Sequence, residues 1–131
     1  MKKTNGFTLI ELLAVIVILA IIAVIATPII LGVINSAKKN AAESSAAGFV
    51  QAVLSQEQLS ELGIEGYKAV SYPLKTAAIA GIKHTGTAPT AANIVKSGAT
   101  YSGCLTVNGY VYDVGATGTV KYRENQAVCA Q

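Results

Sequence analysis

The chain has 131 residues, of which 52% are hydrophobic and only 13% are charged, and its formal net charge is +3. This length suits one ordinary domain. Removing Lys2 and Lys3 leaves eight basic against seven acidic side chains. The rest of the chain therefore lacks the basic stripe that binds nucleic acid, and no specific nucleic-acid partner is expected.

The first quarter of the chain is dominated by an apolar run. Residues 12–26 contain no polar side chain, and after Thr27-Pro28 the apolar character resumes over residues 29–34. About 20 such residues span a bilayer, and proline is tolerated in membrane helices. No A-x-A-like cleavage site follows, so a retained membrane segment is preferred to a secretory signal peptide. The Lys38-Lys39 pair behind the run is expected in the headgroup region or in solvent.

Residues 1–6 are short and basic and end in glycine. By the positive-inside rule, Lys2 and Lys3 keep the N-terminus on the cytoplasmic side. Two interpretations fit this segment equally well on charge alone. It is either a leader peptide that is later removed or an ordinary cytoplasmic tail on a signal anchor.

One long helix is predicted over residues 7–62. Residues 7–34 are apolar on every side and must be buried all round, in lipid or among other helices. Residues 35–62 continue the helix as an amphipathic segment. Gly63 is predicted to stop it in the left-handed conformation. The inner face of the second half is predicted to carry Ala37, Ala41, Ser45, Phe49, Ala52, Val53, Gln56 and either Leu59 or Ser60.

A helix of this length would be roughly 84 Å long at 1.5 Å per residue. The remaining residues 63–131 form a head that is too small to cover all of it. The helix therefore needs an external partner. Pro28 removes a hydrogen bond from the helix, so a kink or local unwinding is predicted near Thr27.

The first part of the head, residues 64–100, is the least readable. Residues 67–72 suggest a strand that Pro73 ends, and residues 74–82 have helical content. Residues 84–98 are expected to form a connecting loop with a short helix at 91–96. His84, the single histidine, is expected to be a surface residue.

The last third of the chain predicts an antiparallel meander. Strands are expected at 103–107, 110–114 and 119–123, with a second turn at 115–118. Asn108-Gly109 is the strongest hairpin signal, because a type I′ turn needs positive φ at both positions. The sheet face with Leu105 and Val107, and either the tyrosines or Val111, should pack on the helix. The predicted fold class is α+β, a long N-terminal helix packed by a small antiparallel sheet.

Cys104 and Cys129 are the only two cysteines. Their spacing does not suggest a metal site, whereas two cysteines in a small exported domain favour a disulfide. Two buried thiols are the alternative. A disulfide closing this loop would stabilise the head by roughly 3.5 kcal/mol in the chain-entropy model.

No catalytic site is expected. His84 is the only candidate for the usual general base, and it lies in a Thr/Gly-rich loop. The head offers just three carboxylates, Glu65, Asp113 and Glu124, and the solvated face of a sheet explains Asp113. Phosphate-binding, dinucleotide-binding and metal motifs are all missing from the sequence, so no cofactor and no metal are expected.

The stretch Gly6-Phe7-Thr8-Leu9-Ile10-Glu11, with two lysines before it and the apolar run behind it, resembles the type IV pilin family. This family includes pilins and the pseudopilins of secretion and DNA-uptake machines. The strong match covers residues 1–34, and the short leader resembles the type IVa branch. The late cysteine pair resembles the disulfide-bounded C-terminal region of many pilins.

The resemblance implies that a prepilin peptidase cuts between Gly6 and Phe7 and that the new amino group of Phe7 is N-methylated. It also marks Glu11 as the acid of the assembly segment. An intramembrane carboxylate is costly and should have a partner. The amino group of Phe7 from a neighbouring subunit is such a partner. Alternatively, Glu11 lies at the interface and stabilises the N-terminus of its own helix.

The expected function is that of a structural subunit, the major pilin, of a type IV pilus. The chain would start as a single-pass precursor in the bacterial plasma membrane. It would then polymerise through its N-terminal helices into a surface filament, of the kind that serves adhesion, twitching motility, DNA uptake or biofilm formation. Prepilin peptidase and the assembly machinery with its motor ATPase would be partners, and Pro28 would let the helix bend or locally melt during packing.

Two alternatives stay open from the sequence. The first is a pseudopilin or minor pilin of a type II secretion or DNA-uptake system. The second belongs to another class, a membrane-anchored binding domain that never assembles. Abundant surface filaments would distinguish a major pilin from both.

Overall fold

The structure, a computed structural model, describes residues 6–125 and 127–129. It confirms the α+β class, with one long helix followed by a five-stranded antiparallel sheet. The predicted leader residues 1–5, with Lys2 and Lys3, lie outside the described residues. In chain order the elements are α1 (Leu9–Glu61), β1 (Leu74–Lys75), the 3-10 helix η1 (Thr76–Gly81), β2 (Ala91–Ser97), β3 (Thr100–Val107), β4 (Tyr110–Val114) and β5 (Val120–Tyr122).

The long helix is terminated by Gly63, as the sequence predicts. Gly63 has a φ of 69°, which is the left-handed conformation. Its amide donates to the Ser60 carbonyl and the Ile64 amide donates to the Leu59 carbonyl, each at 3.1 Å. This pair of bonds is the Schellman arrangement, which satisfies the last carbonyls of a helix. The prediction for Gly63 is therefore confirmed.

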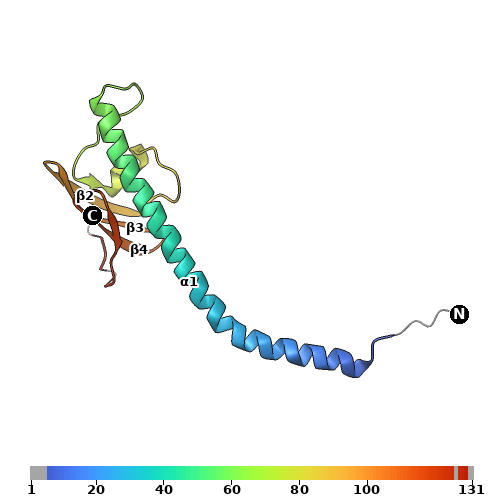
Figure 1. Ribbon diagram of the computed structural model, residues 1–131. Coiled ribbons are helices and arrows are strands. Elements are labelled where there is room, and N and C mark those ends of the chain that lie inside the picture. Colours follow the sequence, from blue (N-terminus) through green and yellow to red (C-terminus); the bar gives the residue numbers. More distant parts are fainter. Residues whose placement is uncertain (1–5, 126, 130–131) are drawn as a thin grey trace. The chain divides into compact units, whose positions relative to one another are not determined.

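The chain divides into two compact units, residues 1–37 and 38–131, and α1 contributes to both. The first unit consists of the apolar part of α1. The second contains the rest of α1 and all five strands, with the sheet lying along one side of the helix (Figure 1).

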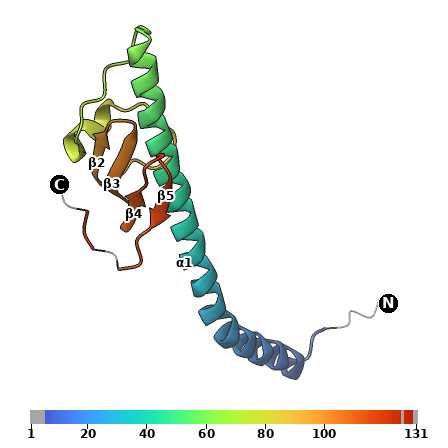
Figure 2. The ribbon, with the colours of Figure 1, turned by 60° about the vertical axis from the view of Figure 1, so that its left-hand side comes forward.

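The sheet has the strand order β1-β2-β3-β4-β5, with each strand antiparallel to its neighbours (Figure 2). The short helix predicted at 91–96 is wrong, because Ala91–Ser97 is strand β2. Its side chains alternate, so that Ala92 and Ile94 are buried against the helix while Val95 is exposed. Seven pairings with β3 outweigh the weak local helical preference of this segment.

The strand predicted at 67–72 is also wrong. Pairing starts only after Pro73, at Leu74–Lys75, which is an edge strand of two residues. Proline cannot donate to a strand ladder, and residues before it find no partner strand. The helical content predicted for residues 74–82 is confirmed only in its later part, as the 3-10 helix η1.

The predicted Asn-Gly hairpin is confirmed. Asn108 and Gly109 have φ angles of 51° and 82°, and they connect β3 to β4. Positive φ at both positions is the requirement of a type I′ turn. The strand before this turn is longer than predicted, because β3 starts at Thr100 rather than at Gly103.

The core lies between the second half of α1 and the inner face of the sheet. The tyrosine alternative is the correct one, because Tyr112 is buried beside Leu105 and Val107, whereas Val111 faces the other side. On α1 the predicted positions Ala41 and Ser45 are wrong, since the buried small residues lie one position later. The buried residues of α1 are Ala42, Ala46, Phe49, Val50, Val53 and Gln56.

His84 was expected on the surface, but it is half-buried. Its ring meets the Phe49 ring edge-on, with 5.2 Å between the ring centres. Its Nδ1 lies 2.9 Å from the Ile82 carbonyl oxygen, which can only accept a hydrogen bond. This contact fixes the tautomer with the proton on Nδ1. His84 therefore packs the 82–90 segment against the helix.

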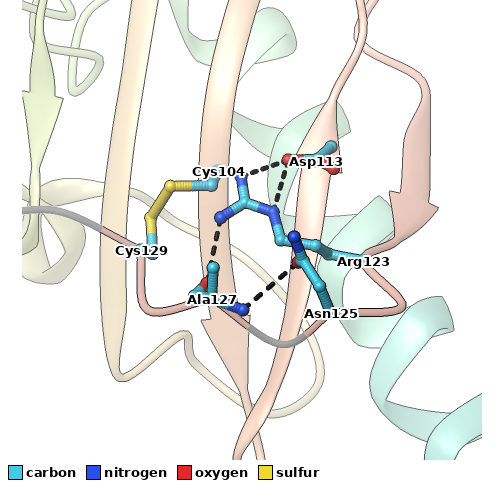
Figure 3. A network of polar contacts seen from close by, with 6 residues as sticks. All are labelled: Cys104, Asp113, Arg123, Asn125, Ala127 and Cys129. Carbon is cyan, nitrogen blue, oxygen red and sulfur yellow. Dashed lines mark hydrogen bonds and ion pairs between the residues drawn. A yellow bond between two sulfur atoms is a disulfide. The ribbon is translucent and has the colours of Figure 1, made fainter.

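The C-terminal tail lies over the outer face of the sheet (Figure 3). A disulfide joins Cys104 of β3 to Cys129, and both cysteines are buried together with Val111. The guanidinium of Arg123 binds the Asp113 carboxylate and donates to the Ala127 carbonyl at 3.0 Å. These contacts hold the tail in place on the sheet.

Candidate processing and assembly site

The helix begins at the predicted processing motif with a capping box. Glu11 donates its amide to Thr8 Oγ1 at 3.3 Å, and its Oε2 accepts from the Thr8 amide and hydroxyl at 2.8 and 2.7 Å. Such a reciprocal pair satisfies two amides that have no partner within the helix. The intact chain thus uses Glu11 at the N-terminus of its own helix. Both bonds use Oε2, and neither engages the other carboxylate oxygen, Oε1.

The predicted cleavage position lies just before this capping box. Phe7 is 86% exposed, and apart from the adjacent residues no described part of the chain lies within 4 Å of the place where a Cβ on Gly6 would be. The peptide bond between these two residues is therefore open to another protein. With this bond intact, the Phe7 nitrogen is an amide and carries no charge.

The helix beyond the capping box presents an apolar surface in every direction. Every large hydrophobic side chain from Leu9 to Ile34 is at least 41% exposed. Within the described residues, α1 is the one helix that is long and apolar enough to cross a membrane. Such a surface is stable only when lipid or other helices cover it.

Pro28 lies inside α1 and does not unwind it. The helical backbone continues through Thr27 and Pro28, so the predicted alternative of local unwinding does not occur, and a kink at this point stays a prediction. The Thr27 hydroxyl donates to the Ala23 carbonyl at 2.7 Å. The carbonyl that Pro28 leaves without an amide donor is instead that of Val24, four residues before it.

The second unit contains a polar cluster that the sequence did not reveal. Glu57 of α1 binds Lys96 of β2 and accepts from the hydroxyls of Tyr101 and Tyr72, at 2.7 and 3.1 Å. Glu57 is not among the residues predicted for the inner face of the helix, yet its side chain is only 12% exposed. A carboxylate between two tyrosines and a lysine ties the helix to two strands and a loop. No local sequence signal joins residues so far apart.

The cluster fixes the charge of Glu57. Burial alone would raise the pKa of this carboxyl, but bonds from Lys96, Tyr101 and Tyr72 hold its pKa below the usual value. Burial and the Glu57 carboxylate raise the pKa of Tyr72 above its ordinary range. The cluster therefore contains a carboxylate and two neutral phenols at neutral pH.

Glu57→Gln is expected to lower the free energy of unfolding by roughly 2 kcal/mol at neutral pH, because it removes charged hydrogen bonds. Since the folded pKa is lowered, the wild-type advantage is present above the ordinary pKa of 4.5 and is lost as the pH falls through the lower pKa of the folded state. Denaturant unfolding at pH 7 and pH 3.5 measures this. The exposed Glu65→Gln is the matched control. A loss that stays constant with pH would contradict this role of the carboxylate.

A comparison with known protein families agrees with the processing motif and capping box at the start of α1. The model described as the prokaryotic N-terminal methylation motif matches residues 1–27, which include Gly6, Phe7 and Glu11. This motif is the type IV prepilin signature, and the long helix with its antiparallel sheet matches the type IV pilin fold. The chain carries the features of a type IV pilin-like or pseudopilin-like substrate of prepilin peptidase. No characterised protein and no solved structure matches the chain.

The motif family is structural rather than catalytic. Within the described residues, no three His, Cys, Asp or Glu side chains are grouped as a metal site would require. The predicted site residues fall into two groups, one in each unit of the chain. Gly6, Phe7, Glu11 and Pro28 lie along the first unit, whereas Cys104 and Cys129 join the tail to the sheet of the second.

Proposed function

We propose that this chain is the major structural subunit of a type IV pilus. The precursor is inserted in the plasma membrane through α1, with its head outside. A prepilin peptidase cuts after Gly6 and the Phe7 amine is methylated. The processed subunit then leaves the bilayer and polymerises with other copies through the apolar part of α1.

The observation that carries this proposal is the apolar surface of α1 together with the motif at its start. Lipid covers this surface in the precursor, and neighbouring helices cover it in a filament. Van der Waals packing between helices then replaces contact with lipid tails. The same surface thus has two successive environments, and cleavage is the step between them.

Glu11 has a second role in this scheme. Cleavage converts the Phe7 amide into an amine, which carries a positive charge. The Glu11 carboxylate of one subunit pairs with this amine of the next, and Oε1 is the oxygen that its capping bonds leave unused. A charge pair in apolar surroundings has a strong preference for one register. Pairing would therefore align each arriving subunit.

Glu11→Gln separates pairing from capping, because glutamine keeps a capping-box acceptor but has no charge. Filament yield is expected to fall by at least about tenfold, since one charge-assisted bond per subunit is lost. Electron microscopy of sheared surface material measures the yield. The control is Glu124→Gln, an exposed carboxylate of the head. Wild-type filament numbers in Glu11→Gln would show that capping alone is the role of this residue.

The N-terminus of filament subunits gives an independent test. Mass spectrometry of surface material is expected to find chains that begin at Phe7 with one added methyl group. Subunits that retain Met1 in filaments would overturn the processing scheme. Processed chains without abundant surface filaments would instead favour a pseudopilin or minor pilin, and unprocessed chains that stay in the membrane would favour an anchored binding domain.

A further inference from the structure

Strand β5 runs along α1 toward the end of the second unit where the apolar run arrives. A Cβ on Gly118, just before β5, would lie 2.6 Å from Leu54. Further along, the ammonium group of Lys39 lies 3.4 Å from the ring centre of Tyr122. The contacts thus descend the helix from residue 54 to residue 39. The last residue of β5 is therefore beside the first turn of α1 in this unit, as Figure 2 allows the reader to follow.

Aromatic rings and lysines gather at this end. Tyr122 lies between Tyr110 and Tyr112, with ring centres 6.3 and 5.9 Å apart. The hydroxyl of buried Tyr112 donates to the Lys39 carbonyl at 2.9 Å. Tyr110 and Tyr122 are only half-buried, and Lys38 is exposed. We call Lys38, Lys39, Tyr110 and Tyr122 the base of the head.

The chain itself holds the base close to the membrane surface. Lys38 follows Ile34 by four residues, or about 6 Å of helix. The headgroup layer beyond the hydrocarbon is itself about 5–8 Å thick on each side. Tyrosine is enriched in this layer because its ring is apolar and its hydroxyl polar. Basic residues next to a span are attracted by anionic lipids.

We propose that the base of the head docks on anionic phospholipid headgroups while the chain is in the membrane. Lys38 contacts the phosphates directly, and the rings of Tyr110 and Tyr122 rest among the headgroups. Lys39 holds Tyr122 in place through its ammonium group. This inference rests only on the membrane-anchored stage of the proposed function. It implies that a subunit must leave this lipid contact when it joins a filament.

The neighbouring charges permit this docking. Arg123 and Asp113 bind each other, so their charges largely cancel. The other charged residues at or next to the base are three lysines, Lys38, Lys39 and Lys121, and two carboxylates, Glu43 and Glu124. The excess is small, so the attraction is moderate and reversible. A reversible contact suits a subunit that is later extracted.

Photo-crosslinking of the full chain in vesicles tests the proposal. p-Benzoylphenylalanine replaces Tyr110 in one sample and Tyr67, which lies at the other end of the head, in a second. A third sample carries it at Ile18 and reports insertion of the apolar run. Vesicles contain either phosphatidylcholine alone or phosphatidylcholine with about 30% phosphatidylglycerol, which gives the membrane a negative surface potential. Lipid adducts are quantified by mass spectrometry.

Adducts at position 110 are expected in vesicles with phosphatidylglycerol, well above those at position 67. They should fall about fivefold with Lys38→Gln, the effect of one lysine near an anionic surface, but not with Lys68→Gln. Equal adducts at positions 110 and 67, or no dependence on Lys38, would overturn the docking while adducts at Ile18 still support the membrane stage. Missing adducts at Ile18 would overturn both.

Discussion

Gly103→Ala is expected to unfold the head. Gly103 has a φ of 136°, and a Cβ there would lie 2.0 Å from the Asn93 carbonyl oxygen. The clash is with backbone in the paired strand β2, so no side chain can move away to relieve it. Conformations of this kind are essentially limited to glycine. We expect a loss of more than about 4 kcal/mol, which is the range of severe substitutions.

Circular dichroism and denaturant unfolding of the full chain in detergent measure this loss. Gly98→Ala is the matched control, since Gly98 also has a positive φ, of 61°, but its Cβ position meets nothing within 4 Å in the described structure beyond the adjacent residues. It should cost only about 1 kcal/mol. If both variants lose the same small amount, the close approach of β2 and β3 at Gly103 is not a constraint on the fold.

Replacing both cysteines, as Cys104→Ala with Cys129→Ala, is expected to remove roughly 3.5 kcal/mol of stability. The two residues are 25 positions apart, and the disulfide restricts this loop in the unfolded chain. For a domain of this size the loss corresponds to a fall in the unfolding temperature of roughly 15–25 °C. The tail should also become the first site of protease cleavage.

Thermal unfolding and limited proteolysis measure these two effects. Wild-type protein treated with a reducing agent is the internal control and should match the double variant. The bonds of Arg123 to Asp113 and Ala127 remain in both samples. A double variant that unfolds within a few degrees of wild type would show that these polar contacts alone hold the tail.

Features that depend on neighbouring residues could be predicted from the sequence. The apolar run predicted α1, and Gly63 and Asn108-Gly109 predicted the helix end and the hairpin, because positive φ is a local requirement. The processing motif is likewise a short contiguous pattern, and a family model recognises it within residues 1–27. The capping box is also visible in it, as Thr8 and Glu11 at the required spacing.

Features that depend on distant partners could not be predicted. The sequence predicts a loop with a short helix where strand β2 lies, because the strand is stabilised by its pairing with β3 and not by local preference. The buried face of α1 was misplaced by one residue at Ala42 and Ala46, since small residues give little periodic contrast. Glu57 is not on the predicted inner face, because its partners Lys96 and Tyr101 are 39 and 44 positions away in the sequence.

The sequence by itself determined the membrane-length helix, the processing motif at its start and the α+β class, because each follows from local composition and periodicity. Only the tertiary structure decided that the sheet has five strands, that Tyr112 rather than Val111 faces the helix, and that Glu57 joins helix and sheet. Those outcomes depend on which segments pair across the fold. Side-chain burial and charge pairing follow from this pairing of distant segments and not from the neighbouring residues in the chain.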